Sequence, residues 1–321
     1  MTLYLDDDDV SALLPMEDAV ACVDSAFRLL SDASAVNEVR HRTETPDVGL
    51  NVMWAIVPSA GVLGVKSYSV VRRDVSQGAV LTLLLYSVDT GELLSVIKAD
   101  RLGQLRTGAA SAVATRTLAA PQAETLAVYG TGFQAETQVL ALAATVPGLR
   151  SVRVVGRTQE RRDDFIERMR TLVHIGVDVG AAEPEEAARG ADLLVTATGS
   201  ADPVVRGDWV TPGSHVNAVG SNLSTRRELD RALLARASVI VVDDHDAALK
   251  ECGDLIANGW DQDEVVALGD VLTGRAAGRR DDSEVTVFES QGLAVQDVAC
   301  AALVHERAVA AGAGRPLSGA D

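Results

Sequence analysis

Hydrophobic and polar positions follow two different patterns along the chain, and the pattern changes near residue 120. In the first part, apolar positions at helical spacing follow Pro15 to Asp18, a segment that suits the first turn of a helix. Four mainly apolar segments come next and are predicted to be strands: Leu50 to Val57, Val62 to Val71, Gly78 to Ser87 and Leu93 to Ile97. Because these strands follow one another directly, they predict antiparallel sheet.

From residue 124 onward, short apolar segments alternate with helical ones. The predicted strands are Leu126 to Tyr129, Val152 to Val155, Leu193 to Thr196, His215 to Val219 and Val239 to Val242. Helices are predicted from Gln134 to Thr145 and from Glu160 to Thr171, and a last helix from Ala294 to Ala311. Strands that alternate with helices predict a parallel, doubly wound sheet. The fold class is therefore α/β, with a Rossmann-type domain over residues 121–293 and a discontinuous α+β domain over 1–120 and 294–321.

Composition narrows the range of partners. The chain has 321 residues and a net charge of −17, which disfavours nucleic acid and anionic membrane surfaces. It has no apolar stretch of transmembrane length, and its first residues lack the basic start of a signal peptide, so we expect a cytoplasmic protein. The three cysteines and five histidines show no disulfide or metal spacing, so no metal is predicted.

A glycine-rich turn follows the first strand of the Rossmann pattern. It reads G-x-G-x-x-A, and the residues assigned to the cofactor are Gly130, Thr131, Gly132, Phe133 and Gln134. The first glycine permits a tight turn, and the second lets a pyrophosphate approach the backbone at a helix start. With a strand before it and a helix after it, the motif predicts a dinucleotide-binding site.

The end of the second strand bears on the choice of cofactor. An acidic residue there would hold the ribose hydroxyls of NAD, but the chain has Gly156, Arg157 and Thr158. Since an arginine pairs with a 2′-phosphate, Arg157 and Thr158 favour NADP(H), and NAD(H) stays open. The predicted cofactor site also includes three residues at or just after the later strands: Thr198, Val219 and Gly220.

Three basic residues stand out in the first region. They are Arg42, Lys66 in a mostly apolar strand, and Arg106 before a run of small residues. The segment after Arg106 resembles a helix start, whose free N–H groups would face an anion. Spacing alone does not show that the three cations converge, and each also suits a solvent-exposed position.

Along nearly its whole length the chain resembles the ornithine cyclodeaminase/mu-crystallin family. The matching motifs occur in the family's order: His41-Arg42-Thr43, Gly64-Val65-Lys66, Leu105 to Ala110, the Gly130 turn, Asn217 to Gly220, Arg227 to Asp230 and Ser290 to Asp297. The resemblance implies a Rossmann domain joined to a discontinuous domain for substrate binding and dimerisation, and hence a homodimer. It also implies that Arg42, Lys66 and Arg106 hold the carboxylate of an amino or imino acid, and that Lys66 acts near the reacting carbon–nitrogen bond.

One position departs from the cyclodeaminases of that family. Where they carry an aspartate that serves the substrate amine, this chain has Asn222. Asparagine has neither the charge nor the basicity of a carboxylate. Asn222 therefore argues against ornithine cyclisation, but it does not affect the expectation of hydride transfer. Asn222 also suits a plain turn after the strand.

The leading hypothesis is an oxidoreductase that transfers hydride from NAD(P)H to the imine carbon of a small cyclic α-imino acid, as a ketimine or pyrroline-2-carboxylate reductase does. The catalytic candidates are Lys66, Arg42, Arg106 and Asn222. Three alternatives stay open: an NAD-dependent, ammonia-releasing cyclodeaminase, an alanine dehydrogenase-like enzyme, and a cofactor-binding protein without turnover.

Overall fold

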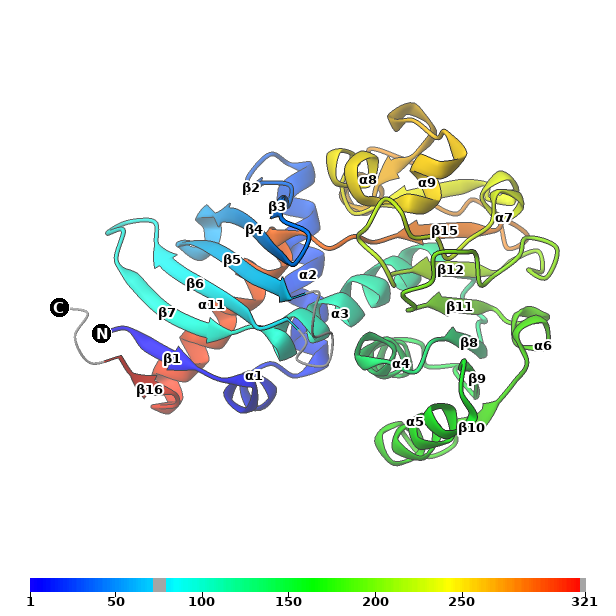
Figure 1. The fold of residues 1–321 in the computed structure, drawn as a ribbon, viewed down its shortest axis with the longest axis horizontal. Helices are drawn as coiled ribbons and strands as arrows, with labels where there is room; N and C mark the ends of the chain where they lie inside the picture. Colours follow the sequence, from blue (N-terminus) through cyan, green and yellow to red (C-terminus); the bar gives the residue numbers. More distant parts are fainter. Residues whose placement is uncertain (72–78, 318–321) are drawn as a thin grey trace. The chain divides into compact units, whose positions relative to one another are not determined.

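The computed structural model describes residues 1–71 and 79–317, and the chain divides into two units (Figure 1). Unit 1 consists of Met1–Arg106 and Leu293–Asp321, and unit 2 of Thr107–Gly292. The first boundary lies inside helix α3 (Asp100–Leu118), whereas residue 120, where the sequence analysis placed it, follows the end of the same helix. The chain returns to unit 1 immediately before helix α11 (Ala294–Ala311).

Unit 1 is built on a mixed sheet. Over the described residues its strand order is β16-β1-β7-β6-β5-β4-β2, with β3 paired to β4. The strands are β1 (Leu3–Leu5), β2 (Val36–Asn37), β3 (His41–Glu44), β4 (Val48–Val57), β5 (Val62–Val71), β6 (Leu81–Ser87), β7 (Leu93–Lys98) and β16 (Arg315–Pro316). The strands from β4 to β7 pair antiparallel, as predicted. The predicted start of β6 at Gly78 lies outside the described residues.

Helices α2 (Met16–Ser31) and α11 pack together in unit 1, and α11 also packs on β4 and β5, while α1 (Asp7–Leu13) contacts α11. A turn of 3-10 helix, η1 (Pro58–Ala60), joins β4 to β5. Gly64 allows the close contact between β5 and α11, because a Cβ at this position would lie 2.8 Å from a methyl carbon of Val298. Ala19, Val23 and Phe27 of α2 are fully buried, as their helical spacing predicted.

Unit 2 has the Rossmann-type sheet. Its strand order is β10-β9-β8-β11-β12-β15-β13-β14 within the described residues, and every pair in it is parallel. The strands are β8 (Thr125–Tyr129), β9 (Ser151–Val155), β10 (Asp178–Ala181), β11 (Leu193–Thr196), β12 (His215–Ala218), β13 (Val239–Val242), β14 (Val266–Ala267) and β15 (Thr286–Glu289). The order reverses at β8, so this strand marks the switch point at which doubly wound sheets bind ligands.

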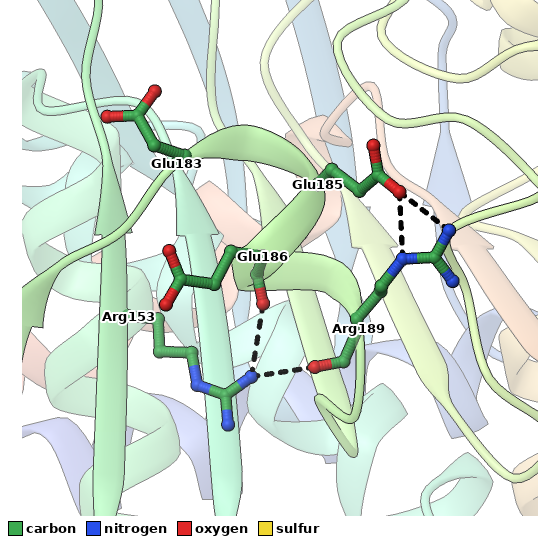
Figure 2. A pocket seen from close by; sticks show the side chains of 5 residues that line it. All are labelled: Arg153, Glu183, Glu185, Glu186 and Arg189. Carbon is green, nitrogen blue, oxygen red and sulfur yellow. Dashed lines mark hydrogen bonds and ion pairs between the residues drawn. The ribbon is translucent and has the colours of Figure 1, made fainter.

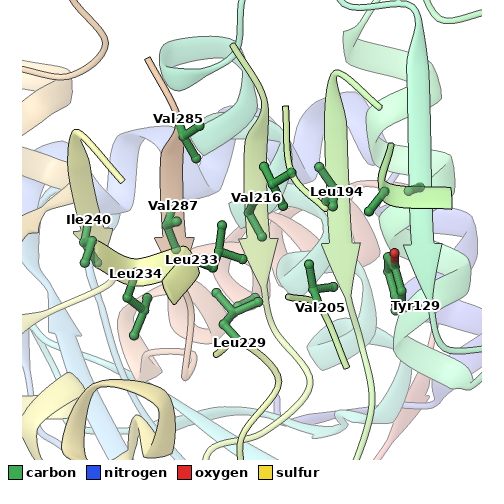
Figure 3. Packing of buried hydrophobic residues seen from close by; sticks show 14 of the residues in the cluster. Tyr129, Leu194, Val205, Val216, Leu229, Leu233, Leu234, Ile240, Val285 and Val287 are labelled. Carbon is green, nitrogen blue, oxygen red and sulfur yellow. The ribbon is translucent and has the colours of Figure 1, made fainter. Parts of the chain in front are cut away.

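Side chains alternate between the two faces of this sheet and supply two cores. Leu126 and Val128 of β8 join helices α4 (Phe133–Thr145) and α5 (Gln159–Leu172) on one face. Tyr129 belongs to the other core (Figure 3), which also contains residues of α6 (Pro184–Ala188), α7 (Arg231–Arg236), α8 (His245–Glu251) and α9 (Gly253–Asn258). Burial of each large apolar side chain contributes about 1.5–3 kcal/mol, which holds the strand ends in place. Short elements complete the unit: η3 (Gln262–Glu264) and α10 (Leu268–Thr273).

The sequence analysis missed some elements of this sheet. Strand β15 lies between β12 and β13, whereas the sequence analysis predicted no strand between Val242 and the helix that begins at Ala294. Two of its four residues, Thr286 and Glu289, are polar although they are buried. They interrupt the apolar run by which a buried strand is recognised in a sequence. Strand β10 was also missed, because it contains Asp178 and Gly180. None of the helices described over residues 1–71 and 79–317 combines the length and apolar character that a membrane crossing requires.

Candidate functional site

The Gly130 turn joins β8 to α4 at the carboxyl end of the switch-point strand. Gly130 has a φ of +122°, a conformation that L side chains rarely adopt, and its N–H donates to the Val155 carbonyl over 2.9 Å. A Cβ on Gly130 would lie 2.4 Å from the Ala197 oxygen, after β11. The glycine is therefore required both by the turn and by the close approach of the neighbouring loop.

The start of helix α4 is suited to a diphosphate. Gly132 occupies the N-cap position without a side-chain hydrogen bond, and a Cβ built there meets no atom within 4 Å. The backbone is thus open to a ligand at a helix N-terminus, where the helix dipole favours anions. Gln134 adds a buried Oε1 that accepts no hydrogen bond from any residue the structure describes. Ala135 is fully buried, as the third position of the motif requires.

The end of β9 carries the residues expected to select the cofactor. Gly156 packs against the glycine turn, since a Cβ there would lie 2.9 Å from Thr131 Cγ2. Arg157 and Thr158 are exposed, and Thr158 is the N-cap of α5 without a side-chain hydrogen bond. Arg157 forms no ion pair or hydrogen bond with any residue in the described part of the chain. An exposed arginine beside the turn fits a ribose phosphate, and the preference for NADP(H) stays a prediction.

The loops after β11 and β12 lie against each other. A Cβ on Gly220 would be 2.3 Å from both the nitrogen and the oxygen of Thr198, so only glycine fits. Val219 is nearly buried, and its N–H donates to the Thr196 carbonyl over 2.9 Å. Both loops also contact Glu228, which the sequence analysis named only within a family motif. Asn222 follows in the same segment and is half-buried; its role stays a prediction.

In unit 1, two of the predicted cations converge on one carboxylate. Lys66 Nζ of β5 donates to Asp297 Oδ1 of α11 over 2.8 Å, and Arg106 Nε donates to the same oxygen over 3.1 Å. Arg106 also donates to Gln296 Oε1 over 3.1 Å. Asp297 is fully buried, and its Oδ2 accepts no hydrogen bond from a described residue. The sequence analysis did not single out Asp297, although an acid in the first turn of a largely apolar helix was its signal.

Burial and neighbouring charges set the protonation of this cluster. Burial lowers the pKa of Lys66 to about 8; Asp297 opposes the change, and Arg106 and Arg40 add to it. Burial by itself would raise the pKa of Asp297, but Arg106 and Lys66 outweigh it and lower that pKa. Arg40 is a further cation, 8% exposed, that the sequence analysis missed. Two cations, Lys66 and Arg106, share the one carboxylate of Asp297, so the cluster retains positive charge that favours a bound anion.

The expected helix start at Arg106 is wrong. Helix α3 begins at Asp100, and the Gly103 N–H already donates to the Ala99 carbonyl over 2.9 Å. The backbone N–H groups that follow Arg106 therefore lie within the helix, where they are needed for its own hydrogen bonds. It is the guanidinium of Arg106, not a helix terminus, that reaches the cluster. Gly103 lies one turn earlier, and a Cβ on it would be 3.4 Å from Lys66 Nζ.

Arg42 lies on β3, opposite Asn51 of β4, and is half-buried. β4 pairs in turn with β5, where Met53 is opposite Lys66. The structure thus places Arg42 in the same sheet as Lys66, and its contact with a substrate carboxylate stays a prediction.

A depression of about 650 Å³ on unit 2 is lined by Arg153, Glu183, Glu185, Glu186 and Arg189 (Figure 2). Arg189 pairs with Glu185 over 2.6 Å, and Arg153 donates to the Arg189 carbonyl over 2.8 Å (Figure 2). Both arginines are already bonded, and no predicted site residue lines this surface, so we assign it no ligand. Among the described residues, no group of three or more His, Cys, Asp or Glu side chains is arranged to hold a metal ion.

Comparison with known proteins gives consistent matches. The profile of the ornithine cyclodeaminase/mu-crystallin family matches residues 2–312. The Delta(1)-pyrroline-2-carboxylate reductase of Bacillus cereus is 35% identical over 274 residues, or 83% of either chain. The structure of the Thermococcus litoralis Delta(1)-pyrroline-2-carboxylate reductase in complex with NADH and L-proline matches with a TM-score of 0.92 and 29% identity, over 98% of this chain and 100% of that one. An archaeal alanine dehydrogenase dimer with bound NAD has a TM-score of 0.92 and 31% identity, over 99% of both chains.

Proposed function

Because the chain belongs to the ornithine cyclodeaminase/mu-crystallin family, we propose that it is an NAD(P)H-dependent reductase of small cyclic α-imino acids. The observation that carries the proposal is the buried cluster of Lys66, Arg106 and Asp297, whose cations outnumber its carboxylate. A cluster of this kind favours a small carboxylate, and the similar Thermococcus protein was solved with NADH and L-proline.

The chain's own residues would bind and orient the substrate. Arg106 and Arg42 would hold its carboxylate, since a guanidinium can bind both oxygens at once. Lys66 would stand beside the carbon–nitrogen bond, with Asp297 keeping its ammonium oriented. At neutral pH Lys66 retains its proton, because its pKa of about 8 lies above 7, and it can donate that proton to the imine nitrogen.

When bound, a reduced nicotinamide would supply the hydride for the imine carbon. The Gly130 turn, Gly132 and Gln134 would hold its diphosphate at the start of α4, where the backbone is open. Arg157 and Thr158 would bind the ribose end, and their chemistry supports NADP(H) over NAD(H). Thr198, Val219 and Gly220 would face the other half of the dinucleotide.

An alanine dehydrogenase activity is the second candidate, because the archaeal alanine dehydrogenase has the same fold over nearly the full chain. Both reactions transfer hydride to a carbon–nitrogen bond beside a carboxylate, so the same cluster would serve either. Asn222 argues against a cyclodeaminase, because an amide cannot take up the proton that a carboxylate accepts. We further propose a homodimer, since that alanine dehydrogenase is a dimer, and a cytoplasmic location, since the acidic composition suits a soluble enzyme.

One screen tests the proposal. Oxidation of NADPH and NADH is followed with pyrroline-2-carboxylate and its six-membered homologue, and separately with pyruvate plus ammonia. Turnover of the cyclic imines without added ammonia supports the reductase. Turnover only with pyruvate and ammonia favours the dehydrogenase, and ammonia release from ornithine identifies a cyclodeaminase. A cofactor that binds tightly without turnover of any of these substrates would favour a non-enzymatic protein.

A further inference from the structure

Glu228 holds together the two loops that follow β11 and β12, and we propose that it is the positioning residue for the nicotinamide half of the cofactor. The inference rests on the proposed function, because it names the residue that sets the geometry of that cofactor site. Glu228 lies in unit 2, outside every strand and helix, and is 2% exposed.

Both carboxylate oxygens of Glu228 accept hydrogen bonds from the ends of these strands. The Thr198 N–H donates to Oε1 over 2.6 Å, and the Gly220 N–H donates to Oε2 over 2.7 Å. Thr196 Oγ1, at the end of β11, adds a hydrogen bond to Oε2 over 3.0 Å. Hydrogen bonds to an ionised carboxylate are short and strong, so this one group fixes the separation of the two loops.

The Glu228 backbone is itself held from two directions. Its N–H donates to Asp254 Oδ1 over 2.9 Å, and its carbonyl accepts from the Val204 N–H over 2.8 Å. The Leu229 N–H donates to the same Asp254 oxygen over 3.0 Å. The carboxylate therefore extends from a fixed point, which is what preorganisation of a binding site requires.

Close packing makes the loops respond together. A Cβ on Gly220 would lie 2.4 Å from Glu228 Oε1 and 2.3 Å from Thr198 N. No side chain fits at position 220, so a shift of the carboxylate between the loops must move both.

The strand order assigns these loops to one half of a dinucleotide. β9 and β10 lie on one side of the switch-point strand β8, and β11 and β12 lie on the other. A dinucleotide binds across this reversal, with its adenosine ribose at the end of the second strand, here β9. The loops held by Glu228 therefore face the nicotinamide half, while Arg157 and Thr158 belong to the adenosine half.

The main test compares a whole dinucleotide with its fragment. In Glu228→Gln, the amide NH₂ must face either the Thr198 N–H or the Gly220 N–H, and neither can accept a hydrogen bond from it. Calorimetry on the full chain would use NADH or NADPH, whichever the wild type binds more tightly, and ADP or 2′-phospho-ADP as the fragment. We expect the dissociation constant of the dinucleotide to rise about 10- to 100-fold and that of the fragment to change less than about 2-fold.

Glu284→Gln is the matched control. Glu284 is a nearly buried carboxylate of the same unit that accepts from the Arg280 N–H over 2.7 Å, just before β15 begins. This variant is expected to bind both ligands like the wild type. Thr196→Val is a milder second variant, which removes only the 3.0 Å hydrogen bond and should weaken dinucleotide binding a few-fold.

The outcomes separate positioning from general stability. Equal weakening of dinucleotide and fragment, or no weakening of either, would overturn the positioning role. If Glu228→Gln does not fold, the same comparison of dinucleotide and fragment binding is made with Thr196→Val, and equal weakening or no weakening there would overturn the positioning role. A wild-type protein that binds neither NADH nor NADPH would refute the proposed function itself.

Discussion

Lys66 Nζ and Asp297 Oδ1 lie 2.8 Å apart in a buried ion pair whose residues are separated by 231 positions in the sequence. The pair joins β5 to α11 in unit 1 and leaves the second oxygen of Asp297 without a described partner. A buried carboxylate that holds two cations orients both of them, and removing it would leave both charges uncompensated.

Asp297→Asn should therefore destabilise unit 1 by about 3–5 kcal/mol, because Lys66 and Arg106 lose the charge that compensates them. Urea unfolding of the full chain measures the change in the free energy of unfolding. In the double variant with Lys66→Met, one buried cation is also removed, and we expect part of the stability to return. If the double variant loses as much free energy of unfolding as the two single variants together, the pair is not energetically coupled.

Lys66→Ala should lower kcat/KM for the imino acid at least about 100-fold, because the variant lacks the group that balances charge and supplies a proton at the imine. Cofactor affinity should not change, since Lys66 belongs to unit 1 and the glycine turn to unit 2. Lys98→Ala is the control, as Lys98 is an exposed lysine of the same unit that pairs with Asp7 over 2.6 Å. Equal turnover in Lys66→Ala and the wild type would refute the assigned role.

The pH dependence of reduction should follow the Lys66 ammonium. Burial lowers the pKa of Lys66 to about 8, so kcat/KM is expected to fall as the pH rises through 8. The stability of the folded chain should instead increase with pH in this range. The unfolded chain keeps this proton up to its ordinary pKa of 10.5, so the free energy of unfolding rises between pH 8 and 10.5. Lys66→Arg should have low kcat/KM, because arginine does not give up its proton, and the residual activity should lack the fall near pH 8, because arginine stays charged.

Arg157→Ala should weaken NADPH binding about 10- to 100-fold and leave NADH binding nearly unchanged, because only NADPH carries the 2′-phosphate. Fluorescence titration with each nucleotide gives the ratio of dissociation constants. Arg161→Ala is a suitable control, since Arg161 is an exposed arginine of α5 in the same segment. If both nucleotides lose affinity equally, Arg157 does not select the cofactor.

Dinucleotide affinity should fall at acidic pH. Burial raises the pKa of Glu228 to about 7, while its hydrogen bonds to Thr198 and Gly220 partly oppose the change. Below pH 7 an O–H replaces one acceptor, so a loop N–H loses its partner and binding weakens. Asp254, with a pKa raised to about 6, and Glu289, whose pKa is raised by burial, are the neighbouring acids. Glu228→Gln should show a flatter profile, which calorimetry at pH 6 and 8 would reveal.

Local sequence determined the features that depend on neighbouring residues. The alternation of strands and helices after residue 124 predicted the Rossmann-type sheet, and direct succession of strands predicted the antiparallel part of the other sheet. The Gly130 turn was also predictable, because its glycine conformations and the helix start that follows are set within six residues. Helix α11 was predicted with its observed bounds, since its apolar spacing repeats over many turns.

Tertiary structure alone decided which distant charges meet. The sequence shows Lys66, Arg106 and Asp297 as separate polar residues in apolar or small-residue surroundings, and only the packing of β5, α3 and α11 joins them. Arg40, which adds a further positive charge, and Glu228, whose hydrogen-bond donors lie 8 to 32 residues away, were missed for the same reason. Periodicity records which face of an element is buried, but the partner of a buried charge depends on how separate elements pack, and no local pattern contains that information.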